Sequence, residues 1–283
     1  YNPANFKAAG LTVPKTDADM TKLTETIKSK KLGYPWCIGI ESGGATGWAA
    51  TDWMEEYVLR YGGEAQYTAW WKGKLAWSSP TVQKAAKKFA DIALTPGNVN
   101  GGGKAIAATG FGATANLFAT DKNKCFMMRQ GSFITDFFPD AVKAEYKANN
   151  FTRVGVFKLP APAGTTDAVL GGGDLAAAFD ANPATQKVLN FILSDKLGQG
   201  AMLANYPSYL SAHKTFPSAG YKNPITKNIA GILSTAKLFG FDGSDLAPAI
   251  VNATEWTELT NWIAGKKTQK QAFDAIDASW KKA

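Results

Sequence analysis

The sequence is short of arginine and histidine, although the chain as a whole is basic. Its 31 lysine and arginine residues include only Arg60, Arg129 and Arg153 as arginines, and 23 acidic residues leave a net charge of +8. Contacts to phosphates and guanine bases favour the planar, bidentate arginine side chain over the lysine ammonium group. We therefore interpret the excess charge as a solvated lysine surface, and we expect no nucleic acid partner.

The sequence also lacks any run of about 18 consecutive apolar residues, the length that a membrane-spanning helix requires. Hydrophobic residues nevertheless make up 45% of the 283 residues, and charged residues make up 19%. This composition supplies a sizeable core, argues against intrinsic disorder and, with the length, suggests about two domains. The chain begins Tyr-Asn-Pro, with neither a methionine nor a leader, which we interpret as processing or truncation before residue 1.

Two cysteines and one histidine are too few for a zinc site, and we expect no metal and no cofactor. The single histidine, His213, leaves only one possible base for a Ser-His-Asp hydrolase, and we interpret it as a loop or surface residue. Cys37 and Cys125 each lie in a strand-like run. The spacing alone is equally consistent with two buried thiols in a reducing cytosol and with one disulfide in an oxidising, extracytoplasmic compartment.

Motifs of the common enzyme classes are missing from the sequence. There is no Gly-x-Ser-x-Gly elbow, no His-Glu-x-x-His and no Walker sequence, and the glycine runs 101–103 and 171–173 lack the context of phosphate-binding loops. Glu41, Asp52 and Asp174 are carboxylates that a glycosidase could use, but the sequence does not fix the distances between them. A secreted glycoside hydrolase using paired carboxylates therefore stays open as the alternative function.

Strand-like and helical patterns alternate along the chain, which predicts α/β layers. Strands are expected near 34–40, 125–130, 154–157 and 168–170. Helices are expected near 17–31, 47–61, 80–92, 113–119, 183–197, 224–237, 246–264 and 268–282. Thr16 and Thr268 are expected to cap their helices, and Gly62-Gly63 is expected to end the second one.

Aromatic residues are frequent, with nine Trp, nine Tyr and 16 Phe, or 12% of the chain. The flat apolar face and polar edge of Trp and Tyr suit sugar rings, whose C–H faces stack while their hydroxyls form hydrogen bonds. Most of these aromatic residues must form core. Two lie where an expected element begins or ends, Trp48 at a helix start and Phe133 just past a strand. For each of them, core packing and sugar stacking are equally open interpretations.

Five segments along the chain form a recognisable series in a fixed order. They are Tyr1-Asn-Pro-Ala-Asn-Phe6 with Ala8-Ala-Gly-Leu11 and Pro14-Lys-Thr16, Gly47-Trp-Ala-Ala-Thr-Asp-Trp53, Cys125-Phe-Met-Met-Arg-Gln-Gly-Ser-Phe-Ile-Thr-Asp-Phe-Phe-Pro139, Gly171-Gly-Gly-Asp174 and Leu210-Ser-Ala-His213-Lys214. Together they resemble the extracellular solute-binding proteins of carbohydrate ABC transporters, a family similar to maltose-binding protein. The third segment resembles the α-glucoside-binding branch, whereas Ala49 replaces a proline that is usual in the second.

The resemblance implies a type II periplasmic-binding-protein fold, in which two α/β lobes are joined by crossing hinge strands and hold the sugar between them. In that plan, residues 1–166 and 216–283 form the second, C-terminal lobe. Residues 167–215 form the returning part of the first, N-terminal lobe. The first lobe is then expected to be incomplete in this chain, with its opening segment, and any membrane anchor, supplied from outside this sequence or by another chain.

The resemblance also implies a binding protein rather than an enzyme. It would bind an α-glucoside or similar oligosaccharide in the periplasm or outside the cell, close around it, and deliver it to ABC transporter permease subunits. It favours a disulfide between Cys37 and Cys125. Trp48 and Phe133 would stack on the sugar, and Asp174 would bind two of its hydroxyls. The full set of ligand-binding residues that it implies is Thr46, Gly47, Trp48, Asp52, Gln130, Phe133, Gly172, Gly173, Asp174 and Trp256.

Overall fold

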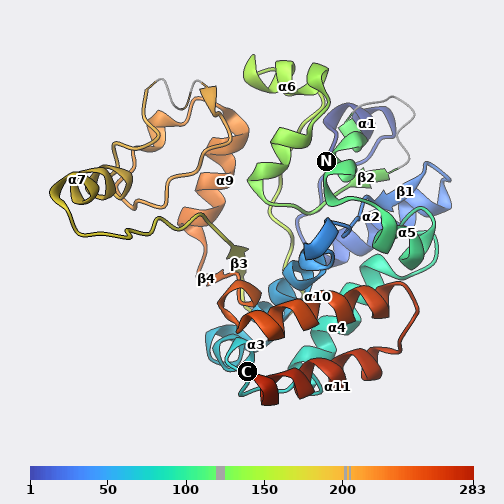
Figure 1. Cartoon of the computed structure of the whole chain (residues 1–283). Coiled ribbons are helices and arrows are strands. Elements are labelled where there is room, and N and C mark those ends of the chain that lie inside the picture. The colour runs from blue at the N-terminus through green and yellow to red at the C-terminus, as the bar shows by residue number, and fades with distance from the viewer. Residues whose placement is uncertain (119–124, 201–202, 204) are drawn as a thin grey trace.

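The computed structural model describes residues 1–118, 125–200, 203 and 205–283. They form a helical body and an arm, residues 172–237, which projects to one side of the body (Figure 1). The chain passes between body and arm at strands β3 (Ala168–Gly171) and β4 (Leu238–Phe241). These two strands pair in parallel, with Ala168 opposite Leu238 and Gly171 opposite Phe241.

Helices account for most of the described structure. The α-helices are α1 (Pro3–Ala8), α2 (Asp17–Ser29), α3 (Trp48–Trp71), α4 (Pro80–Ala93), α5 (Gly102–Ala108), α6 (Asp140–Lys147), α7 (Pro183–Ile192), α9 (Pro224–Thr235), α10 (Ala249–Ile263) and α11 (Gln269–Ser279). The 3₁₀ turns are η1 (Gly43–Ala45), η2 (Phe111–Phe118), η3 (Ser132–Phe137), η4 (Ser218–Gly220), η5 (Ser244–Leu246) and η6 (Trp280–Lys282). None of the α-helices within these described ranges is long and apolar enough to cross a membrane.

Helix starts follow the sequence closely because side chains satisfy the free N–H groups of the first turn. Thr16 and Thr268 cap their helices as predicted, and each forms a capping box, with Asp19 and Gln271 respectively. Helix α4 begins at Pro80 as predicted, but the side chain of Ser79 makes no capping hydrogen bond. The 113–119 region is a 3₁₀ turn rather than an α-helix, and residue 119 lies outside the described ranges.

The prediction that Gly62-Gly63 ends the second helix is wrong. Gly63 has φ 64° and ψ −172°, which interrupts the helical backbone, but the chain resumes the helix and continues to Trp71. Tyr67 and Trp70, which follow the kink, are buried. Burial of these two rings against the core stabilises the second half of α3 and outweighs the local preference of glycine to stop a helix.

Strands in the described ranges are fewer and shorter than the α/β prediction required. Besides the β3–β4 pair, β1 (Tyr34–Trp36) runs parallel to β2 (Cys125–Met127). The strand predicted at 154–157 is not present. There, Gly155 exchanges two hydrogen bonds of 2.9 Å with Tyr1, and this single residue pair is too short to count as a strand.

The core of the body is built around α3 and is rich in aromatic side chains. Trp53 of α3 contacts Phe89 of α4, which contacts Trp262 of α10, which in turn contacts Phe273 of α11, with ring centroids 5.6 to 6.0 Å apart. The predicted apolar face of α4 is fully confirmed, because Val82, Ala85, Ala86, Phe89 and Ile92 are all buried. Most aromatic residues outside the arm therefore serve packing.

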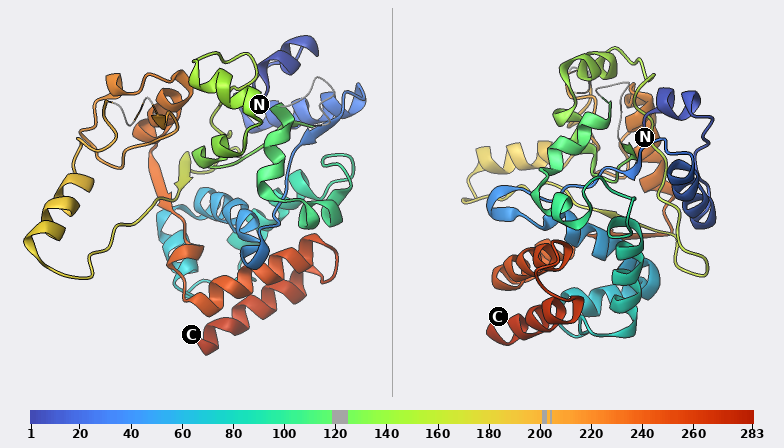
Figure 2. Two further views of the ribbon diagram at one scale, coloured as in Figure 1. Left: turned by 45° about the horizontal axis from the view of Figure 1, so that its top comes forward. Right: turned by 90° about the vertical axis from the view of Figure 1, so that its right-hand side faces the viewer.

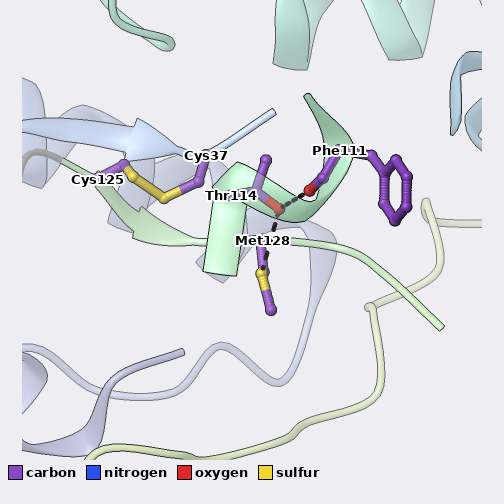
Figure 3. The surroundings of a disulfide bond; sticks show 5 residues. All are labelled: Cys37, Phe111, Thr114, Cys125 and Met128. Atoms are coloured by element: carbon purple, nitrogen blue, oxygen red, sulfur yellow. Dashed lines mark hydrogen bonds between the residues drawn. A yellow bond between two sulfur atoms is a disulfide. The ribbon is translucent and has the colours of Figure 1, made fainter. Parts of the chain in front are cut away.

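A disulfide joins Cys37 to Cys125 across the β1–β2 pair, with 5.4 Å between the Cα atoms (Figure 3). Cys37 also donates its backbone N–H to the carbonyl of Met127. Within η2, the Thr114 hydroxyl donates to the carbonyl of Phe111 at 2.6 Å, and it lies 3.7 Å from the sulfur of Met128, the residue after β2. The structure thus has the disulfide that the family resemblance implied.

The part of the arm around α7 is poorly covered by the rest of the described chain (Figure 2), whereas α9 packs against Tyr146 of α6 through Ile225 and Thr226. A set of large apolar side chains on and around α7 is exposed, namely Leu175, Phe179, Val188, Phe191 and Leu193. A groove of about 410 Å³ runs between residues 176–177 and α7. Monomeric soluble proteins rarely expose so many large apolar side chains close together. Such a surface is typically covered by another protein segment.

Candidate ligand-binding site

Four aromatic rings from three separate elements meet at one place on the surface of the body. We call Trp48, Phe111, Phe133 and Phe137 the aromatic cluster. Phe111, at the start of η2, contacts the other three rings, with centroid distances of 5.0 Å to Trp48, 6.3 Å to Phe133 and 4.9 Å to Phe137. Trp48 also lies 5.7 Å from Phe133. Two of the rings are also accessible to solvent, because the side chains of Phe133 and Phe137 are 42% and 46% exposed.

The loop before α3 fixes the position of Trp48. Gly47 has φ 119°, and a Cβ atom there would lie 2.3 Å from the backbone oxygen of Trp256 on α10. The N–H of Gly47 donates to the carbonyl of Ile40, which ties this turn to the end of the preceding segment. Only glycine permits both this backbone conformation and this close approach. Gly47 therefore determines the position of Trp48, the first residue of α3.

Replacing Gly47 by alanine should lower the free energy of unfolding by at least about 2 kcal/mol, since the methyl group meets backbone that cannot move aside. Chemical denaturation of the two proteins measures this difference. Gly44→Ala is the control, because no atom lies within 4 Å of a Cβ at that position, and it should change stability by less than about 0.5 kcal/mol. Equal effects of the two substitutions would contradict the role given to Gly47.

Polar groups border the aromatic cluster on the side of residues 41–46. The exposed carboxylate of Glu41 accepts the N–H of Gly43 at 2.7 Å, and the backbone carbonyl of Glu41 accepts the N–H of Phe111. The Thr46 hydroxyl donates to the carbonyl of Gly43 and accepts from the N–H of Ser42. Aromatic rings beside exposed oxygen and N–H groups can stack on an apolar face while they bind hydroxyls.

Asp52 lies one turn after Trp48 on α3 and is already engaged with the protein. Its carboxylate is 3.4 Å from Nη1 of Arg129, whose guanidinium also bonds Glu56 and lies 5.3 Å from the ring of Trp53. Burial raises the pKa of Asp52 to about 7, with Arg129 opposing the shift. The contact with Arg129 is therefore enough to account for the position of the Asp52 side chain. A contact between Asp52 and a sugar stays a prediction. Gln130 follows Arg129 and is half-buried.

The remaining predicted residues fall into two places. Trp256 is half-buried on α10, and its backbone lies against the turn at Gly47. Thr260 of the same helix donates to the carbonyl of Thr46. Among the described ring contacts, none joins Trp256 to the aromatic cluster. Gly172, Gly173 and Asp174 instead lie exposed where the chain enters the arm. Among the described contacts, none links Asp174 to the cluster.

Two members of the cluster were not predicted from the sequence. Phe111 lies between two glycines, and Phe137 lies four residues after Phe133 in η3. Phe137 gave no signal of its own, because four positions do not bring two side chains to the same side of a 3₁₀ turn. Phe111 gave no signal either, because only the fold brings η2 to η3.

Comparisons with known proteins give a consistent picture, although no family model matches the chain. The chain is 35% identical over 281 residues to the alpha-glucosides-binding periplasmic protein AglE of Rhizobium meliloti (strain 1021), covering 99% of this chain and 60% of AglE. It is 32% identical over 282 residues to the osmoprotective compounds-binding protein GgtB of Synechocystis sp. (strain PCC 6803), covering 99% of this chain and 64% of GgtB. The chain thus spans about three-fifths of the length of these relatives.

Among solved structures, a chitin oligosaccharide binding protein matches all of this chain and 68% of its own, with a TM-score of 0.75 and 22% sequence identity. The fold is therefore that of the type II periplasmic binding proteins. The comparisons confirm the resemblance, indicated by the sequence motifs, to extracellular solute-binding proteins of carbohydrate ABC transporters.

Proposed function

We propose that this protein binds an α-glucoside or a similar oligosaccharide at the aromatic cluster and delivers it to the permease of an ABC transporter, without making or breaking a bond. The aromatic cluster is the observation that carries the proposal. Its exposed rings, bordered by Glu41 and Thr46, match the mixed apolar and polar surface of a sugar. The name of AglE supports an α-glucoside, and the name of GgtB supports a related osmoprotective solute.

We also propose that the protein works in the periplasm or outside the cell. The disulfide between Cys37 and Cys125 supports this location, because such bonds persist in oxidising compartments. The name of AglE, a periplasmic protein, supports it as well.

The binding cleft in this proposal lies between two lobes, to which residues 1–166 with 216–283 and residues 167–215 belong. The exposed apolar face of the arm supports this division, because the lobe that contains it needs further protein to cover Phe179, Phe191 and their neighbours. About two-fifths of the length of these relatives has no counterpart in this chain. We propose that a corresponding segment completes the first lobe and supplies the remaining sugar contacts, among them those beside Asp174.

Isothermal calorimetry with maltose, trehalose and sucrose tests the proposed function. We expect this chain to bind weakly, and a chimera that adds the unmatched part of AglE to bind more tightly, because closure then brings contacts from both lobes. In the chimera, Trp48→Ala should weaken binding by roughly 30-fold, the effect of losing about 2 kcal/mol of stacking and burial. Ile250→Ala is the control, since Ile250 is 45% exposed on α10 and should leave the affinity unchanged.

Two outcomes would contradict the proposal. The absence of binding of all three sugars to the chimera, with unchanged thermal stability in their presence, would remove sugar binding. Consumption of the sugar during incubation, with loss of that activity in Asp174→Asn, would support the glycoside hydrolase instead. We expect the sugar to be recovered intact after long incubation.

A further inference from the structure

The two strands that join the arm to the body are held by polar side chains of one helix, α3. At one end of the strand pair, Nη2 of Arg60 donates to the carbonyl of Ala168 at 3.3 Å. At the other end, Glu55 accepts the N–H of Gly243 at 2.8 Å and the N–H of Ser244 at 3.2 Å, just after β4. Tyr67 lies beside Glu55, and its hydroxyl is 2.7 Å from the carbonyl oxygen of Phe241. Glu55 is completely buried.

The hydrogen bonds around Tyr67 determine where a proton must lie. The tyrosine hydroxyl has one proton and lies within bonding distance of two groups, the carbonyl oxygen of Phe241 at 2.7 Å and Oε2 of Glu55 at 3.1 Å. A carbonyl oxygen can only accept, so the shorter contact takes the proton of Tyr67. The contact between Tyr67 and Glu55 is then a full hydrogen bond only if the carboxyl group of Glu55 carries a proton of its own.

The charges around Glu55 favour the same protonation state. Asp52 on α3, Asp242 after β4 and Glu255 on α10 all act on Glu55 as like charges. The described ion pairs of Arg60 and Arg129 go to Glu56 and Asp52, and not to Glu55. Burial, followed by these acidic neighbours, raises the pKa of Glu55 well above its ordinary value, although the hydrogen bond from the N–H of Gly243 opposes the shift. Burial also raises the pKa of Glu255 to about 8.

We propose that Glu55 is protonated in the folded protein and that, with Tyr67, it is a positioning residue that fixes the point where the chain leaves for the arm. Gly171, the last residue of β3, is bonded through its carbonyl to the N–H of Asp242, directly beside this clamp. Gly172 and Gly173 follow and are exposed. A change in the direction of the chain entering the arm therefore starts at Gly172 rather than within the strand pair. That the arm rotates at all rests on the proposed function.

Infrared spectroscopy tests the protonation state directly. The wild-type protein at neutral pH should show the carbonyl band of a buried protonated carboxyl group, and Glu55→Gln should lose that band. Glutamine is neutral and can donate its amide N–H to Tyr67 while its oxygen accepts the N–H of Ser244, but it loses the bond from the N–H of Gly243, which Oε2 accepts in the wild type. A spectrum whose protonated-carboxyl bands are the same in both proteins would show that Glu55 is ionised, and it would overturn the proposal.

Spin-label distance measurements test the positioning role. Labels at Lys187→Cys on α7 and Lys87→Cys on α4 report the arm relative to the body, and both cysteines of the natural sequence are already in the disulfide. Tyr67→Phe should broaden the distance distribution, because it removes the donor to Phe241. The control Tyr61→Phe on the same helix should leave the distribution unchanged. Equal widths in Tyr67→Phe and wild type would overturn the proposal.

The pH dependence gives a third readout. Because the pKa of Glu55 is raised on folding, the folded state binds more protons than the unfolded state above pH 4.5, the ordinary value. The free energy of unfolding of the wild type should therefore fall with rising pH relative to that of Glu55→Gln, and parallel curves would contradict the proposal. None of these three measurements uses a sugar, so their results can be interpreted even if the protein proves not to bind sugars.

Discussion

Arg60→Met should lower the free energy of unfolding by about 3–5 kcal/mol, the usual cost of breaking a buried ion pair from one side. The side chains of Arg60 and Glu56 are 1% and 7% exposed, and their charged atoms are 2.5 Å apart. Nη2 of Arg60 also lies 3.0 Å from the carbonyl oxygen of Leu159 and 3.3 Å from that of Ala168, so the substitution takes a donor away from both carbonyls. Glu56 keeps its second partner, Arg129, at 3.0 Å. Chemical denaturation with linear extrapolation measures the change.

Arg153→Met is the matched control for this prediction. Arg153 forms an ion pair with Glu145, in which the two side chains are 25% and 28% exposed. Solvent weakens such a pair, and its loss should cost about 1 kcal/mol or less. A double-mutant cycle with Glu56→Gln should give a coupling energy of at least about 1 kcal/mol between residues 56 and 60. Additive effects would show that Arg60 acts through its carbonyl contacts alone.

Removal of the disulfide should have the second large effect. Cys37 and Cys125 are 88 residues apart in the sequence, so the bond closes a long loop in the unfolded chain. A disulfide across such a loop contributes about 3–4 kcal/mol, chiefly by restricting the unfolded state. The β1–β2 pair that it joins has only three residues in each strand, so few backbone hydrogen bonds can replace it.

The comparison of the wild type with the Cys37→Ser, Cys125→Ser double variant measures this contribution. The wild type should unfold at a lower denaturant concentration when a thiol reductant is present, whereas the double variant should not respond to reductant. A double variant within about 1 kcal/mol of the oxidised wild type would show that the packing around β1 and β2 suffices without the bond.

Local chemistry explains which parts of the fold were predictable. Helix starts at Thr16 and Thr268 depend on residues within one turn, and the sequence contains those residues together. The continuation of α3 past Gly63 depends instead on burial of Tyr67 and Trp70 against distant segments, which no local pattern contains. Strand β4 was missed for a similar reason, because its pairing with β3 joins residues 70 positions apart.

The candidate site divides in the same way. Trp48 and Phe133 were singled out as aromatic residues at element ends, and in the structure their ring centroids lie 5.7 Å apart in one cluster. Phe111, which touches both, was missed because its proximity depends on how η2 packs. The contacts of Gln130, Asp174 and the neighbouring glycines with a sugar stay predictions. For Asp174 and the glycines, the distance to a bound sugar depends on the position of the arm, and the neighbouring sequence does not determine that position.

The parallel pairing of β3 and β4 limits how the arm can move. The chain leaves for the arm after Gly171 and returns before Leu238, and the register puts these two residues at opposite ends of the strand pair. At about 3.3 Å per residue, the two attachment points lie roughly 10 Å apart along the strands. A rigid part attached at two separated points turns most easily about the line through both. Helix α9 is held at a third place, because Tyr146 of α6 contacts Thr226 and Asn223. Rotation of the whole arm about the strand direction would therefore have to break these contacts, and bending across the strands would require the strand pair itself to come apart.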